Sequence, residues 1–124
     1  MKELLDITLP IQLTNSNDGQ GRAWFNSAKT RQVMERDLLA LGQRRKPFEQ
    51  KVKVVVTRIL GKGQRFWDSS SVLRGNYKQL EDAMVSCGWF TDDSTRYIDV
   101  TIGMQDDTQR KSGPATRMQI FDAS

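Results

Sequence analysis

The segment from Lys51 to Leu60 reads KVKVVVTRIL and is the most strongly patterned part of the chain. Its β-branched residues favour an extended backbone, and Val52, Val54 and Val56 recur with the period of two that puts side chains on one face of a strand. We therefore expect a strand here with one buried face. Such a strand needs other strands beside it and a layer over its apolar face, so the rest of the chain must supply both.

Three other segments also show strand patterns. Leu4 to Pro10 alternates weakly and stops at a proline, whereas Arg96 to Met104 alternates clearly. Thr116 to Phe121 follows after the polar stretch QDDTQRKSGP, and two alternating segments joined by a polar turn are expected to pair as a hairpin. In the first strand of this hairpin the apolar residues are predicted to share one face: Ile98, Val100, Ile102 and Met104.

Two segments have the apolar spacing of helices. The first is predicted to begin at a cap on Asn26 or Ser27 and to continue to Leu41, before Gly42. The second stops at Gly88, because glycine tolerates the left-handed dihedrals found after a helix. The expected buried residues are Val33, Met34, Leu38 and Leu41 in the first helix, and Leu73, Tyr77, Leu80, Met84 and Cys87 in the second.

The order of these elements is β-α-β-α-β-β, which predicts an α+β fold. Two helices would then cover one face of a small mixed β-sheet. With 124 residues the chain has the length of one domain, spanning residues 1–124.

The composition excludes several kinds of site. Histidine is absent and cysteine occurs once, so histidine-based triads, His or Cys metal cages and disulfide frameworks are not available. The net charge of +4 suits a polyanionic partner. No apolar run approaches the ~20 residues that span a bilayer, and the first ten residues do not resemble a signal peptide, so we expect a cytoplasmic protein without a membrane partner.

Chemistry-bearing side chains gather in the stretch from Phe66 to Asp93. Asp68 lies in a serine-rich loop, Lys78 in the first turns of the second helix, and Asp92 and Asp93 after its end. If these parts meet in space, the carboxylates could hold a hard divalent cation while the ammonium group neutralises a phosphate. The alternative is that Asp68 caps a loop, that the aspartate pair forms a solvated turn and that the lysine is a surface charge.

The order of these residues resembles the signature of RusA-type Holliday-junction resolvases. In that family an aspartate-x-aspartate-asparagine loop is followed by a lysine, by Asp-Ala-Leu four residues on, and then by a glycine and a double aspartate. Here the matching residues are Lys78, Asp82-Ala83-Met84, Gly88 and Asp92-Asp93. Ile7-Thr8-Leu9-Pro10, with Asn15 shortly after, is similar to the opening strand and asparagine-containing loop of the family.

This resemblance implies a metal-dependent endodeoxyribonuclease that cuts branched DNA as a homodimer. It implies that Asp68, Lys78 and Asp93 are catalytic and that Asp68, Asp92 and Asp93 hold Mg²⁺, for which Mn²⁺ could substitute. A four-way junction needs two symmetric cuts, which a two-fold dimer would make. The expected DNA-binding residues are Asn15, Lys62, Arg65, Arg74 and Lys78.

The chain departs from the family pattern in its aspartate loop. Ser70 and Ser71 stand where the family places a second aspartate and an asparagine. Since serine is a weak ligand for Mg²⁺, a second hypothesis is a branched-DNA-binding module of the same fold that has lost cleavage. A third is a basic protein-interaction domain without a nucleic-acid role.

Overall fold

The computed structural model describes residues 1–14, 23–68 and 71–124, with only the backbone for residues 23–27. Asn15 and Ser70 lie outside the described residues. Within them the chain forms, in order, β1 (Glu3–Leu9), α1 (Ala23–Ala40), β2 (Val52–Ile59), α2 (Tyr77–Ser86), β3 (Ile98–Asp106) and β4 (Ala115–Asp122). This order confirms the predicted sequence of elements.

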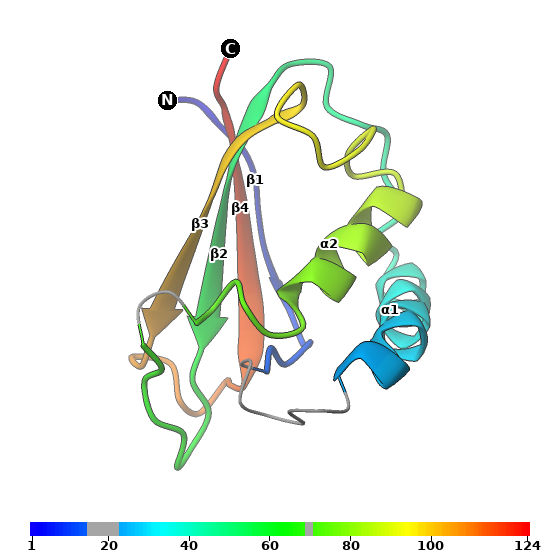
Figure 1. Ribbon diagram of the computed structural model, residues 1–124. Coiled ribbons are helices and arrows are strands. Elements are labelled where there is room, and N and C mark those ends of the chain that lie inside the picture. Colours follow the sequence, from blue (N-terminus) through cyan, green and yellow to red (C-terminus); the bar gives the residue numbers. More distant parts are fainter. Residues whose placement is uncertain (15–22, 69–70) are drawn as a thin grey trace.

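The strands form one mixed sheet in the order β1-β4-β2-β3. β4 is antiparallel to both β1 and β2, whereas β3 runs parallel to β2. Both helices lie on the same side of this sheet (Figure 1). The predicted α+β fold, with two helices on one face of a mixed sheet, is therefore confirmed.

The predicted hairpin between the last two strands is wrong, because β2 lies between β3 and β4. β2 is buried along nearly its whole length and not on one face alone. A strand buried on both faces takes a central position with a partner on each side. The segment containing α2 joins β2 to its parallel neighbour β3, as parallel pairing requires a long crossover.

A bulge divides the apolar residues of β3 between the two faces of the sheet. Val52 pairs with Ile98, but Lys53 pairs with Val100, so one extra residue of β3 is inserted at Asp99. Ile98 therefore packs into the core, while Val100 and the alternate residues after it point to the opposite face. The prediction that all four apolar residues share one face is wrong for this reason.

The inner face of β3 is closely covered beyond the bulge. A Cβ atom on Gly103 would lie 3.0 Å from the Cβ of Val72 and 3.2 Å from the Cγ of Leu73. A larger residue has no room there, so this glycine lets the segment before α2 pack on the strand.

The helices differ from the predictions at their ends and in the width of one face. α2 begins at Tyr77, one turn later than the predicted stripe, and Leu73 packs against the core from the preceding segment. Gly88 has a φ of 88°, as expected after a helix end. α1 begins at Ala23, before the predicted cap at Asn26 or Ser27, and ends at Ala40. Met34 and Leu38 are buried, but Val33 and Leu41, which follows the helix, are exposed, so the predicted buried face was too wide.

One apolar core lies between the sheet and the helices. Its fully buried large side chains include Trp89, Leu9, Leu13, Leu38, Leu80, Met84, Met118 and Ile120. None of the helices in the described part of the chain has the length and apolar character needed to cross a membrane.

Candidate metal centre

Three side chains of α2 share one face of the helix near its first turn. Glu81 and Asp82 follow Lys78 at three and four residues, the spacings that bring helical side chains together. The Lys78 ammonium lies 3.4 Å from a carboxylate oxygen of Glu81 and 3.2 Å from one of Asp82. The helix alone therefore places the Lys78 ammonium group between two carboxylates.

A third carboxylate comes from Asp93, after the end of α2. Gly88 turns the chain back, the Trp89 amide donates to the Met84 carbonyl at 2.9 Å, and the Trp89 indole donates to the Gln43 carbonyl at 2.8 Å. Trp89 and Phe90 are buried, so the following residues are held beside the helix. This return brings the Asp93 carboxylate into contact with Lys78.

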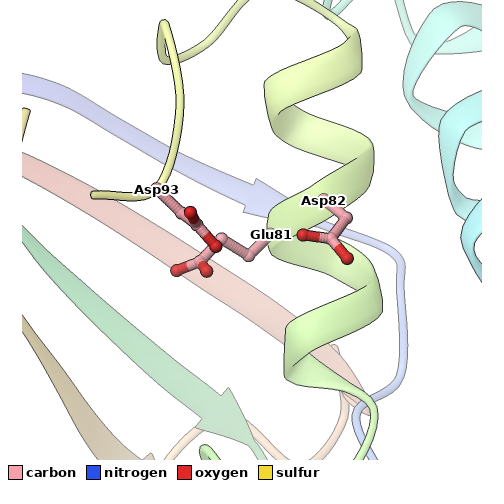
Figure 2. Close-up of side chains that lie close together, drawn as sticks. All are labelled: Glu81, Asp82 and Asp93. Carbon is pink, nitrogen blue, oxygen red and sulfur yellow. The ribbon is translucent and has the colours of Figure 1, made fainter.

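The three acids form a compact group. One carboxylate oxygen each from Glu81, Asp82 and Asp93 lies within 4.8 Å of the others. Figure 2 shows Asp93 reaching from its loop toward Glu81 and Asp82 on the helix. Glu81 is the most enclosed member, with 13% of its side chain exposed, whereas the Lys78 side chain is 55% exposed.

The pKa values of the group reflect this crowding. The hydrogen bond from Lys78 lowers the pKa of Asp93, and the same bond raises the pKa of Lys78. Burial raises the pKa of Glu81 above its ordinary value, because the charge of Lys78 offsets the loss of hydration only in part and the charge of Asp93 adds to it.

Tyr77 adds an unsatisfied polar group next to these acids. Its hydroxyl is buried and has no hydrogen-bond partner among the described residues. Burial raises the pKa of Tyr77 well above its ordinary value, and the negative charge of Glu81 raises it further. The enclosed side of the group therefore combines the negative charge of Glu81 with a buried hydroxyl beside it.

The group fits a divalent cation in its chemistry and charge. Carboxylate oxygens are the ligands that hard cations such as Mg²⁺ and Mn²⁺ prefer. Three ionised carboxylates and one ammonium leave a formal charge of −3 + 1 = −2, which a divalent ion would neutralise. Glu81, Asp82 and Asp93 could therefore bind a metal ion.

Asp68 and Asp92 do not belong to this group of carboxylates. A carboxylate oxygen of Asp92 accepts a 2.7 Å hydrogen bond from the Ser94 amide, which stabilises a turn. Hydrogen bonding from the Ser94 side chain, and then from its amide, lowers the pKa of Asp92. Asp68 is exposed, and its carbonyl accepts a 2.9 Å bond from the Ser71 amide. Of the predicted metal ligands, the structure brings Asp93 to Lys78, and the roles of the other two stay predictions.

The segment that ends at Asp68 is nevertheless firmly held. The Gln105 side chain accepts from the Trp67 amide at 2.8 Å and donates to the Trp67 carbonyl at 3.0 Å. Arg58, which is buried in β2, lies 3.6 Å from the centre of the Trp67 ring and donates to the Arg65 carbonyl at 2.9 Å. These contacts fix the backbone immediately before Asp68.

The predicted DNA-binding residues occupy different positions. Lys62, Arg65 and Arg74 are exposed, in the loop after β2 and in the turn before α2. Lys78 lies in the acidic group, and Asn15 lies outside the described residues. The three exposed basic side chains are accessible to a binding partner. Their role in DNA binding stays a prediction.

Two members of the group were missed by the sequence reasoning. The pattern that resembles the family includes Asp82 without a metal-binding role, and it does not include Glu81. The signal that could have found them is the spacing of three and four from Lys78, because both positions fall beside that lysine on any helix.

A cavity of about 540 Å³ lies elsewhere, beside α1 and the residues that follow β1. It is lined by Pro10, Ile11, Gln12, Lys29, Thr30, Val33, Met34 and Asp37. None of these residues belongs to the acidic group, so the cavity is not part of the candidate metal centre.

The fold and the site define an α+β domain with a lysine held among three carboxylates. Comparison with protein-family models gives no match to this chain. Comparison with curated proteins gives no match either.

Proposed function

We propose that this protein is a metal-dependent endodeoxyribonuclease that cuts branched DNA, such as four-way Holliday junctions, in recombination and repair. The observation that carries the proposal is the contact of the Lys78 ammonium with Asp82 and Asp93. These same residues belong to the sequence signature that resembles RusA-type resolvases. Their convergence from separate parts of the chain supports a shared role.

Mg²⁺ is the cation we propose for the group, and Mn²⁺ could replace it. Such an ion, when bound, would polarise phosphate oxygens and lower the pKa of a coordinated water. Glu81, Asp82 and Asp93 would hold it, with water and substrate phosphate completing the coordination. Asp68 would approach the same site from its own loop, as the resemblance implies.

Lys78 would change partners during this reaction. In the structure its ammonium is shared among three acids, and more than half of the side chain is exposed. A cation bound to the acids would release the ammonium, which could then turn toward the scissile phosphate. There it would neutralise the charge that develops on the phosphate oxygens.

The basic surface would supply most of the affinity for DNA. Lys62, Arg65 and Arg74 are exposed and would contact backbone phosphates. Binding should then weaken steeply as salt rises, because each phosphate contact releases counterions. The same proposal has the protein acting as a homodimer in the cytoplasm.

Cleavage of a labelled synthetic four-way junction with Mg²⁺ tests the proposal. The wild type should make paired nicks, and Asp93→Asn should reduce their rate by about a hundredfold or more. Asp37→Asn is the matched control, because Asp37 of α1 has a half-exposed side chain and lies outside the acidic group. Equal cleavage by wild type and Asp93→Asn would refute the assigned role of the group.

The second candidate is a branched-DNA-binding module that does not cut. The position of Asp68 outside the carboxylate group favours it, because the family resemblance implies that this residue is a metal ligand. Tight junction binding without nicking in Mg²⁺ or Mn²⁺ would support this candidate. Equal affinity for a four-way junction and a linear duplex would count against both candidates, and no DNA binding would favour the basic protein-interaction domain.

A further inference from the structure

The face of the sheet opposite the helices carries an apolar row on β3. Val100, Ile102 and Met104 are 42%, 36% and 53% exposed. The bulge at Asp99 puts them on this face, although the residue before it packs into the core. The outward-facing side chains of β2 beside this row are those of Lys53, Val55 and Thr57.

β3 is also an edge strand of the sheet. Beyond the pairing with β2, the backbone groups of residues 99–105 make no backbone hydrogen bond to other described residues. An edge strand with exposed apolar side chains is a template for pairing with another strand. Exposed apolar patches of this kind mark protein–protein interfaces in soluble proteins.

We propose that β3 is the homodimer interface and that the β3 strands of two copies pair antiparallel about a two-fold axis at Ile102. This inference deepens the proposed function, on which its biological purpose rests, because two symmetric cuts need two equivalent sites. The dimer would have one continuous sheet of eight strands, with the helices of both copies on the same side.

The residues of β3 match a second copy of the same strand. With Ile102 on the axis, it meets Ile102 of the second copy, and Val100 meets Met104 of the second copy. Each exposed apolar side chain thus gains an apolar cross-strand neighbour, which is the unit of stabilisation between paired strands. The small residues between them, Thr101 and Gly103, face each other on the other side of the sheet.

The charges at the two ends of β3 are also complementary in this arrangement. Arg96 precedes the strand, and Asp106 and Asp107 lie at its other end. Antiparallel pairing about Ile102 brings the end of one strand that Arg96 precedes beside the end of the other strand that carries Asp106 and Asp107. Each end of the interface then pairs a base with an acid, whereas parallel pairing would set like charges together.

Light scattering after gel filtration tests the interface without DNA or metal. The wild type should have twice the chain mass of 14.2 kDa at micromolar concentration. Ile102→Lys should raise the dimer dissociation constant at least about tenfold, because it places two like charges on the axis. Leu39→Lys is the matched control, since Leu39 is 40% exposed and belongs to α1, on the opposite side of the sheet from the apolar row (Figure 1).

Introduced cysteines test the position of the axis. The native Cys87 is buried, so a cysteine at an exposed position is the reactive one. Under mild oxidation Ile102→Cys should form disulfide-linked dimers, whereas Leu39→Cys should not. The proposal would be overturned if the wild type were monomeric. It would also be overturned if Ile102→Lys remained dimeric and Ile102→Cys formed no cross-link.

A charge exchange tests the antiparallel direction. Arg96→Asp and Asp107→Arg should each weaken the dimer, and the double variant should restore it to within about twofold of the wild type. Loss of dimer in both single variants without restoration in the double variant would contradict the antiparallel pairing. These outcomes are separate from those of the nuclease proposal, because Asp93→Asn should lose cleavage and remain dimeric.

Discussion

Replacing Gly88 by alanine should lower the free energy of unfolding more than the same replacement at a glycine with open space around it. Gly88 follows α2 with a φ of 88°, in the left-handed region that favours glycine. A Cβ atom there would lie 2.0 Å from the carbonyl oxygen of Arg45, and real Cβ contacts are almost never shorter than 3.0 Å. The Arg45 peptide would have to move by about 1 Å.

The cost of this change can be built from its parts. The left-handed conformation costs alanine about 1–2 kcal/mol, less about 0.4–1 kcal/mol gained by restricting the unfolded chain. Moving Arg45 would weaken the 2.9 Å hydrogen bond that its backbone amide donates to the Cys87 carbonyl. This hydrogen bond contributes about 1 kcal/mol to stability. Forcing an extra methyl group into a packed site adds about 1–3 kcal/mol. The total is about 2–6 kcal/mol.

Gly42→Ala provides the matched control. Gly42 has a φ of 72° after α1, but a Cβ atom there would meet nothing within 4 Å. Urea denaturation followed by tryptophan fluorescence should show a loss of about 1 kcal/mol in the free energy of unfolding for Gly42→Ala and at least about 2 kcal/mol for Gly88→Ala. Equal losses in the two variants would refute the reasoning, because the close approach to Arg45 would then cost nothing.

Other contacts should have measurable effects on stability, hydrogen exchange and metal affinity. Gln105→Leu removes both hydrogen bonds to the Trp67 backbone, so it should cost about 1–3 kcal/mol and speed hydrogen exchange of the Trp67 amide, and unchanged exchange would contradict this. Two hydrogen bonds from the Arg117 guanidinium lower the pKa of Asp6 below 3.8. This ion pair should therefore contribute about 0.5–1 kcal/mol to the free energy of unfolding above pH 3.8. The contribution should be lost as the pH falls through the pKa of Asp6 in the folded protein. Urea midpoints of the wild type and Asp6→Asn should therefore converge in acid. Burial raises the pKa of Glu81 above 4.5, so Mn²⁺ affinity should rise with pH above that value, and Glu81→Gln should remove this part of the pH dependence in calorimetric titrations.

The strands and helices could be predicted from the sequence because their patterns are local. The valines of β2 and the stripe of α2 each depend on residues a few positions apart, and both lie in the core as expected. Strand pairing could not be predicted in the same way. The position of β2 between β3 and β4 depends on burial of both its faces, which alternation along one strand does not reveal.

A single inserted residue explains the largest error in the predicted faces. The bulge at Asp99 reverses which side of the sheet the later residues of β3 occupy. Alternation in the sequence continues unbroken through this position, so no local pattern marks the change. The same reversal created the exposed apolar row that we assign to a dimer interface.

The site was predicted in part. Lys78 and Asp93 meet as expected, because the left-handed turn at Gly88 folds the chain back along α2. The pattern that resembles the family does not include Glu81, although the helical spacing of three from Lys78 places Glu81 beside it. Asp68 was expected in the group on the same resemblance, but its distance from α2 depends on the tertiary packing of the loop before it.

The central claim is that Glu81, Asp82 and Asp93 bind a divalent cation. The most direct test is titration of the protein with Mn²⁺, followed by electron paramagnetic resonance of the free ion. The wild type and Asp37→Asn should each bind Mn²⁺ at one site per chain, and Asp93→Asn should lose this site. Mn²⁺ binding that Asp93→Asn leaves unchanged, or no binding by the wild type, would contradict the claim.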